Sequence, residues 1–450
     1  MKPNICLYFQ VHQPYRLKDL RITNVGHDSE YFDGKKNHEV FRKVAEKCYL
    51  PANALMLELL EKYPDFHIAY SISGVFLEQC EEFGHDVLDS FKKLAATGKV
   101  EFLAETYYHS LSSIHSIPEF CEQVAMHTKK IEDVFGQRPQ IFRNTELIFN
   151  NEIAHMARMM GFRGTLAEGA DRILQGRSPN EPYIPPEFYL PEDRYWNIIK
   201  EYFPGVYPPE KILVLLKNYK LSDDVAFRFS DRSWIGFPLN AETFTDWATG
   251  SGGHSINLFM DYETFGEHQW EDTGIFEFLR KLPEIWQERG IRALTPSQVL
   301  DEWEEKTHKQ ENPEHLEKEI KTILSALSAL WKRPATAKSP LEIQEKTFDA
   351  HLHISWADTE RDLSAWNGNH IQRAALQALY ELEELVKQSG NEHLIRSWRM
   401  LQTSDHLYYM CTKYWSDGDV HKYFSPYDSP YEAYRRFSHA ICDLRAQLHQ

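Results

Sequence analysis

The sequence predicts an α/β fold of alternating strands and helices, and a barrel of parallel strands is its leading architecture. Short β-prone apolar runs at residues 5–11, 67–72, 100–104 and 140–143 alternate with helical patterns. This repeated order implies parallel strands, and 450 residues are enough for a large barrel. A doubly wound open sheet is the second architecture. No glycine-rich phosphate loop follows these strands, which disfavours a nucleotide-binding sheet.

Helices are expected between the strands, at residues 39–50, 52–62, 75–96, 118–135 and 152–160. The helix at 118–135 has a proline in its first turn and Gly136 after its last, the usual residues at helix ends. Further strands are expected at residues 211–216, 256–260 and 292–296, and residues 223–229 alternate in character. The alternation of strands and helices thus extends to about residue 300.

The domain organisation follows from changes in composition along the chain. Residues 178–210 are rich in proline and tyrosine and poor in periodicity, which is typical of a functional loop. After residue 305 the strand signal ends and the pattern is helical. We therefore expect a catalytic barrel over residues 1–305 with a loop insertion around 178–210. An all-helical domain over residues 306–450 is expected to pack on that barrel.

Composition and charge exclude several classes of partner. The net charge of -17 disfavours nucleic acid and anionic membranes, which bind basic surfaces. Aromatic residues make up 13% of the chain, and flat rings that are not in the core suit sugar stacking. The six cysteines are scattered, as in a reduced intracellular protein, and we find no signal peptide or membrane-length apolar run. The sequence predicts a soluble, cytoplasmic protein.

Two carboxylates occupy matching positions at expected strand ends. Asp261 follows the apolar run 256–260, and Glu146 follows the short strand at 140–143, beside Arg143 and Asn144. Those two neighbours are expected to hydrogen-bond Glu146 and keep it ionised. Two acids on different strand ends are what glycoside hydrolysis needs, one to attack the anomeric carbon and one to protonate the leaving oxygen. A solvated acidic loop around Asp261 is the alternative.

Histidines raise the question of a metal site. His12 follows the first strand, where it can contact a substrate hydroxyl, bind metal or serve the structure. His109 and His115, and likewise His351 and His353, lack the spacing of a helical metal-ligand pair. We therefore expect no metal and no other cofactor. No nucleophilic serine elbow is present either.

Several short stretches, in order, resemble glycoside hydrolase family 57, a group of retaining enzymes that act on α-glucans. The five stretches are His12-Gln13-Pro14, Gly98-Lys99-Val100-Glu101-Phe102, Arg143-Asn144-Thr145-Glu146, Asp261-Tyr262-Glu263-Thr264-Phe265-Gly266 and Leu294-Thr295-Pro296-Ser297. Residues 217–224 also resemble the α-amylase-like branch of the family. Each motif alone is weak, but their order and spacing make the combined match specific.

The resemblance implies a (β/α)7 barrel followed by a helical domain, and a double-displacement mechanism. Glu146 would be the nucleophile and Asp261 the general acid/base. The residues expected to bind substrate are His12, Gln13, Glu101, Glu263, Asp405 and His406. Relatives often have tryptophan where His406 stands, so the aromatic platform there is in question. Trp356 and Trp366 are alternative platforms, although core positions are expected for both.

The function expected from this match is cleavage of α-1,4-glucan or malto-oligosaccharide by an α-amylase-type enzyme. Three alternatives stay open. A 4-α-glucanotransferase or glucan branching enzyme of the same family would share the same carboxylates. A non-catalytic sugar-binding homologue would keep the fold alone. A metal-dependent deacetylase or mannosidase would share the barrel shape.

Overall fold

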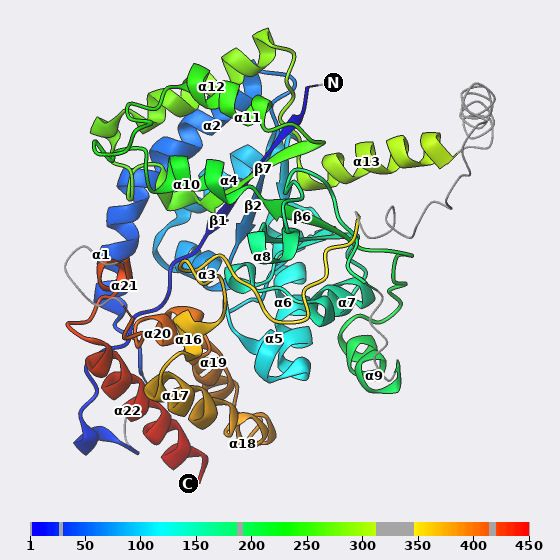
Figure 1. Cartoon of the computed structure of the whole chain (residues 1–450). Coiled ribbons are helices and arrows are strands. Elements are labelled where there is room, and N and C mark those ends of the chain that lie inside the picture. The colour runs from blue at the N-terminus through cyan, green and yellow to red at the C-terminus, as the bar shows by residue number, and fades with distance from the viewer. Residues whose placement is uncertain (1, 27–29, 187–191, 312–345, 414–419, 450) are drawn as a thin grey trace.

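The computed structural model describes residues 2–26, 30–186, 192–311, 346–413 and 420–449 (Figure 1). Within them the chain forms a barrel of parallel strands, surrounded by helices and followed by a group of C-terminal helices. The strands are β1 (Asn4–Val11), β2 (Ile68–Ile72), β3 (Val100–Phe102), β4 (Ile141–Phe142), β5 (Gly164–Glu168), β6 (Leu213–Lys217) and β7 (Ser255–Asp261).

The strands form two parallel sheets, in the orders β3-β2-β1-β7 and β4-β5-β6. Both seams between the sheets are bridged. Ala104, just after β3, pairs with Phe142 of β4. At the other seam the amide of Asn218 donates to the carbonyl of Asn257 at 2.8 Å, and the side chain of Asn257 donates to the carbonyl of Leu216 at 2.9 Å. The seven strands therefore close into the predicted (β/α)7 barrel.

Helices cover the outside of the barrel, and a second group lies beyond its mouth (Figure 1). The helices up to residue 311 are α1 (Gly34–Val44), α2 (Leu50–Lys62), α3 (Gly74–Phe83), α4 (His85–Ala96), α5 (Ser112–His115), α6 (Ile117–Phe135), α7 (Asn151–Met159), α8 (Asp171–Leu174), α9 (Glu192–Tyr202), α10 (Tyr219–Ala226), α11 (Ala241–Gly250), α12 (Ile275–Glu288) and α13 (Pro296–Glu311). The C-terminal helices are α16 (Ser364–Asn367), α17 (His370–Tyr380), α18 (Glu383–Gln388), α19 (Glu392–Leu401), α20 (Ser404–Tyr408), α21 (Val420–Phe424) and α22 (Pro430–Leu448).

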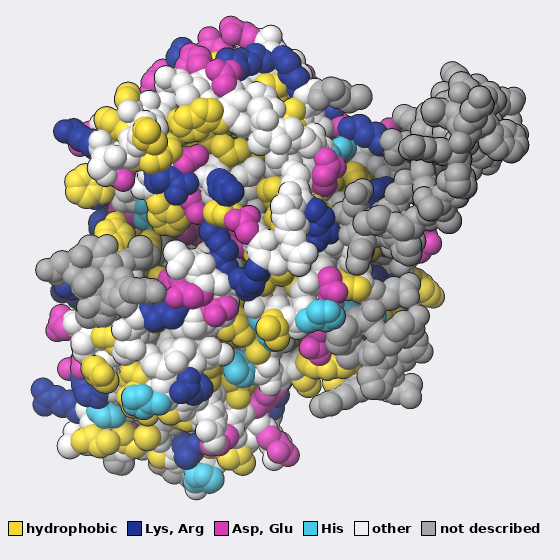
Figure 2. All heavy atoms as spheres, viewed as in Figure 1, with side chains coloured by type: hydrophobic (Ala, Val, Ile, Leu, Met, Phe, Trp, Pro, Cys, Tyr) yellow, Lys and Arg dark blue, Asp and Glu magenta, His cyan; other side chains and the backbone are white. Residues whose placement is uncertain are grey.

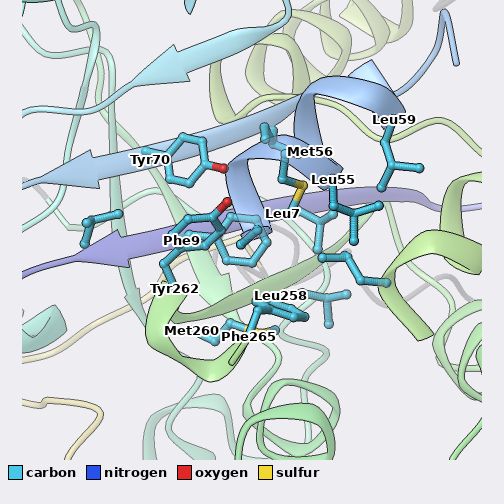
Figure 3. Close-up of a cluster of buried hydrophobic side chains, with 14 of the residues drawn as sticks. Leu7, Phe9, Leu55, Met56, Leu59, Tyr70, Leu258, Met260, Tyr262 and Phe265 are labelled. Carbon is cyan, nitrogen blue, oxygen red and sulfur yellow. The ribbon is translucent and has the colours of Figure 1, made fainter. Parts of the chain in front are cut away.

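The apolar core has one layer inside the barrel and others outside it. The inner layer consists of Tyr8, Ala69, Leu103, Ile141, Leu166, Leu215 and Phe259. At the end of the barrel opposite its mouth, α13 covers this layer with Val299, Leu300 and Trp303. On the outside, β1, β2 and β7 pack against α2 through residues such as Phe9, Met56 and Tyr262 (Figure 3). The strands are buried on both faces, which is why they are continuously apolar in sequence.

The C-terminal helices share a core with the barrel. One buried cluster combines Phe142 and Ile153 with Trp366, Leu379 and Trp398. Ion pairs reinforce this contact, since the fully buried Glu119 of α6 binds Arg399 of α19 and Lys387 of α18, each at 2.9 Å. Thr403 pairs with Ser110, which brings α20 to the loop that follows β3. The helical region is thereby fixed against the mouth of the barrel.

Several elements differ from the sequence prediction. Residues 75–96 form two helices that break at Gly84, whose backbone is not helical. A Cβ at this position would lie 2.3 Å from the ring of Phe41, so only glycine fits there. Residues 223–229 belong mainly to helix α10, which Asn218 caps by accepting from the amide of Leu221 at 3.3 Å. Residues 292–296 do not form a strand; Ala293 makes two isolated bridges, to Ile5 and to Phe66. Strand β5 was not predicted.

The expected insertion and boundary also contain helices. The region 178–210 includes α9, and residues 187–191 within it lie outside the described part. Helix α13 runs through the expected boundary at residue 305, and the first residues of the expected helical domain beyond it, 312–345, are likewise not described. On the face shown in Figure 2, acidic and basic side chains are interspersed over the described surface.

Candidate active site

A layer of polar side chains lines the mouth of the barrel. On each strand, the residue two positions after a member of the inner apolar layer also points inward, since side chains alternate along a strand. These residues are Gln10, Ser71, Glu105, Arg143, Glu168, Lys217 and Asp261. All except Asp261 are at most 5% exposed. The carboxyl ends of parallel strands are where barrel proteins place their catalytic groups.

Glu146 lies just beyond β4, in a short 3-10 turn, with a backbone φ of 58°. This left-handed conformation is uncommon for glutamate and is held in place by its surroundings. Trp356 Nε1 donates to one carboxylate oxygen at 2.8 Å, and Ser404 Oγ donates to the other at 3.0 Å. His109 Nε2 lies 3.4 Å from that second oxygen.

These surroundings keep Glu146 ionised. Burial alone would raise the pKa of its carboxyl. The hydrogen bond from His109 and the positive charges of His109 and Arg143 outweigh burial, so that the pKa lies below its ordinary value. Asn144, which was expected to bind the carboxylate, instead donates to Ser113 Oγ and to the carbonyl of Ile148. Arg143 therefore acts through its charge and Asn144 shapes the turn.

Asp261 ends β7 and stands level with Gln10 of β1. Burial raises the pKa of its carboxyl to about 6, and the negative charge of Glu146 adds to this effect. The positive charges of Arg143 and Lys217 oppose it. Glu146 and Asp261 are thus electrostatic neighbours whose pKa values are shifted in opposite directions. Such a pair is suited to one ionised and one protonated role.

Two stacked imidazoles stand beside Glu146. The rings of His12 and His109 lie 4.0 Å apart at an interplanar angle of 20°. His12 Nδ1 is 2.7 Å from Ser73 Oγ, and its Nε2 is 3.0 Å from Asp405 Oδ2. Burial alone would raise the pKa of Asp405, but its interaction with His12 brings that pKa well below its usual range. His12 and Asp405 therefore lie together beside Glu146, and their expected role in substrate binding stays a prediction.

Gln13 and Glu263 form a buried chain next to Asp261. Gln13 Nε2 donates to the hydroxyl of Tyr49 at 3.2 Å, and that hydroxyl donates to Glu263. Burial and the nearby charge of Asp261 raise the pKa of Glu263 to about 8. Both side chains are at most 8% exposed. Gln13 thus holds the hydroxyl of Tyr49, which in turn binds Glu263.

Two of the expected substrate-binding residues are placed elsewhere. Glu101 points into the barrel two positions before Leu103 of the inner layer, and both the amide and the hydroxyl of Ser297, on α13, donate to its carboxylate. The carboxylate that this strand brings to the mouth is Glu105. His406 is 2% exposed, with its ring between Phe32 and Phe437, and leaves no face for a sugar.

Four residues of the site were not predicted from the sequence as site residues: Glu105, His109, Trp356 and Ser404. The alternation that places Leu103 inside the barrel also places Glu105 there, so a signal for this residue existed. Trp356 was expected in the core, where Trp366 does lie, yet its indole binds Glu146. His109 and Ser404 depend on loop conformation and on long-range packing, for which the sequence has no local signal.

Fold and site together describe a parallel α/β barrel with the carboxyl groups of Glu146 and Asp261 at its mouth. The model of glycosyl hydrolase family 57 matches residues 6–316. The chain is 40% identical over 451 residues to a Methanocaldococcus jannaschii protein named "Putative alpha-amylase". The match covers 98% of this chain and 84% of that protein. The chain therefore belongs to glycosyl hydrolase family 57 and is an α-amylase-like glycoside hydrolase.

Solved structures show the same fold at low sequence identity. A family 57 branching enzyme from Thermococcus kodakaraensis has a TM-score of 0.59 and 13% identity, covering 98% of this chain and 89% of that one. A 4-alpha-glucanotransferase from Thermococcus litoralis has a TM-score of 0.57 and 15% identity, covering 90% and 56%. Among the described residues, no helix is long and apolar enough to cross a membrane. The described His, Cys, Asp and Glu residues also form no group of three or more that could hold a metal ion.

Proposed function

We propose that this protein cleaves α-1,4-glucosidic bonds of α-glucans or malto-oligosaccharides with retention of configuration. In this proposal Glu146 is the nucleophile and Asp261 is the general acid/base. The observation that carries it is the opposite shift of the two pKa values, which leaves Glu146 ionised and Asp261 largely protonated below pH 6. Retaining glycosidases require one carboxyl group in each state.

In the first step a Glu146 oxygen attacks the anomeric carbon, and the bond from that carbon to the leaving oxygen breaks. Asp261 gives its proton to that oxygen, so that the sugar is left as an ester on Glu146. In the second step Asp261 takes a proton from water, whose oxygen attacks the anomeric carbon. The ester bond breaks, and both carboxyl groups return to their starting states.

Transfer to a second sugar is the alternative outcome of the same chemistry. It would differ only in the acceptor, with a sugar hydroxyl in place of water. The observation that favours it is the origin of the groups around the nucleophile. Trp356 and Ser404, which both bind Glu146, and Asp405, which binds His12, all come from beyond residue 345. Groups that close the site in this way restrict the access of water, and a transferase needs water to be kept out.

The test is activity on soluble starch and maltoheptaose, with the products resolved by size. Glu146→Gln and Asp261→Asn are compared with wild type and with Glu277→Gln, a control whose side chain is 64% exposed on α12. We expect turnover by wild type and the control, and losses on the order of 10⁴-fold in both site variants. Glucose and maltose as products indicate hydrolysis, and a ladder of longer chains indicates transfer. Binding of glucan without turnover by wild type would support the non-catalytic alternative and contradict the proposal.

A further inference from the structure

His109 stands between two carboxylates in a way that fixes its charge. Its Nδ1 is 2.8 Å from Glu105 Oε2, and its Nε2 is 3.4 Å from Glu146 Oε1. A neutral imidazole has a hydrogen on only one ring nitrogen, whereas a protonated ring donates from both. Since ionised carboxylates only accept hydrogen bonds, both contacts are satisfied only if His109 is an imidazolium.

The neighbouring His12 faces different partners. The hydroxyl of Ser73 can donate to its Nδ1 while its Nε2 donates to Asp405, so the neutral ring satisfies both contacts. The two rings are stacked 4.0 Å apart, and two positive charges at that distance would repel. The geometry thus assigns the charge of the pair to His109.

Glu105 is built to maintain that charge. Its side chain is fully buried and accepts hydrogen bonds from Gln10 Nε2 at 3.0 Å and from Ser71 Oγ at 2.7 Å, both on Oε1. Its other oxygen is left for His109 at 2.8 Å, with Arg143 at 3.9 Å. A buried carboxylate with this many donors stays ionised and is a fixed negative charge for the imidazole.

We propose that His109 is a permanently charged positioning residue for the nucleophile, with Glu105 as its buried counter-charge. This inference rests on the proposed function and adds a role in the second chemical step. While Glu146 carries the sugar as an ester, it is neutral and His109 faces it without a negative partner on that side. When the ester bond breaks, the electron pair returns to a Glu146 oxygen. His109 stabilises that developing carboxylate and so speeds release of the sugar.

Other titratable groups interact with His109 and set the pH range in which it is charged. They are His12, Glu105, His127, Glu146, Asp261 and Asp405. Burial alone would lower the pKa of His109, but Glu105 and Glu146 raise it to about 9. His12 and His127, both with lowered pKa values, stay neutral around pH 7. The charge of His109 is therefore constant across the range in which Asp261 titrates.

The variants for the test follow from the backbone at His109, whose φ is 51°. Asparagine and glycine adopt this left-handed conformation more readily than most residues, so His109→Asn and His109→Gly are suitable replacements. We expect kcat of H109N to fall on the order of 10²-fold, as for loss of a preorganised donor at a developing anion. KM should fall as well, because the glycosyl-enzyme accumulates when its breakdown becomes slow.

Two further readouts separate this role from a structural one. The acid limb of kcat/KM should move to higher pH in H109N, because Glu146 loses the charge that lowers its pKa. Added imidazole should restore activity to H109G, while His115→Gly, at a ring stacked on Tyr380 away from the carboxylates, should be neither impaired nor rescued. An unchanged acid limb with no accumulation in H109N would overturn the proposal, and so would impairment of H109N that imidazole cannot relieve in H109G.

An NMR titration keeps this inference distinct from the function proposed above. The His109 ring resonances, identified by their loss in H109N, should report a protonated ring up to about pH 9 in wild type and only to a lower pH in Glu105→Gln. This readout needs no turnover. A neutral His109 at pH 7 would overturn the inference even if the enzyme is active on glucans. A charged His109 in a protein inert on glucans would contradict the function alone.

Discussion

The carboxyl groups on the β3–β4 side of the barrel mouth differ from those on the β5–β7 side in what surrounds them. Glu105 and Glu146 each accept hydrogen bonds from at least two side chains and share His109, and their pKa values are lowered. Glu168 and Asp261 are buried with fewer donors, and their pKa values are raised to about 7 and about 6.

The difference shows how one barrel mouth can hold carboxyl groups in two opposite protonation states. Hydrogen bonds and an imidazole stabilise negative charge on one side, where the proposed nucleophile lies. Burial without matching donors favours the protonated form on the other side, where the proposed acid lies. The positive groups on that side, Lys217 and Arg361, lie 3.9 Å and 2.9 Å from Glu168 and only partly offset the burial.

The largest effect should come from changing the leaving group, which separates the two sides. With α-maltosyl fluoride, fluoride departs without a proton, so the first step no longer needs Asp261. We expect Asp261→Asn to regain on the order of 10²-fold relative to its activity on starch, since general acid catalysis supplies about that much. Glu146→Gln should regain nothing. Equal behaviour of both variants on the fluoride would show that the two carboxyl groups do not divide the roles in this way.

A smaller loss should follow from removing one donor on the nucleophile side. Trp356→Phe deletes the 2.8 Å hydrogen bond to Glu146 but keeps an aromatic ring beside Arg143, whose guanidinium lies 4.8 Å from the indole centroid. We expect kcat/KM to fall about 10- to 100-fold, because a hydrogen bond to a charged group contributes roughly 1.5–3 kcal/mol. Trp270→Phe, at a ring that is 57% exposed, is the matched control. Equal kinetics for both variants would show that the hydrogen bond from Trp356 does not contribute to catalysis.

The smallest effect concerns the pH dependence of stability that carboxyl groups on the β5–β7 side of the barrel mouth produce. The pKa values of Glu168 and Glu263, about 7 and about 8, lie above those of an unfolded chain, which are about 4.3. Their contribution is complete below the unfolded pKa and is lost as the pH rises through 7 and 8. The Tm of wild type should therefore decline from pH 6 to pH 9. Glu263→Gln, which cannot ionise, should show a shallower decline, and a parallel one would contradict the shifted pKa of this residue.

Sequence reasoning predicted the barrel, which is confirmed, and the positions of Glu146 and Asp261 at strand ends, because both depend on local patterns. Apolar strands buried on both faces are visible as short runs, and Glu146 and Asp261 each follow one. Glu105 could also have been predicted to point into the barrel, since it follows the inward-pointing Leu103 by two positions. The N-cap at Asn218 could likewise have indicated helix α10 in place of an alternating segment.

The remaining features depend on contacts between distant segments. The need for glycine at residue 84, where the predicted helix breaks, depends on the ring of Phe41 on another helix. His109 meets Glu146 from a loop position with a left-handed backbone, and Ser404 lies 258 positions further along the chain than Glu146. The motif match misplaced Glu101 and His406 because a motif gives the order of residues, not the depth of a side chain in the barrel.

The central claim is that Glu146 forms a covalent bond to the sugar, and trapping that intermediate tests it most directly. A ring-fluorinated α-glucosyl fluoride, which slows the second step, is incubated with the enzyme, and the labelled peptide is located by mass spectrometry. We expect one added glucosyl group on Glu146 of the wild type. Labelling of Glu146→Gln should be slow or absent. A label on another residue, or turnover of the probe with an inverted anomeric product and no label, would contradict it.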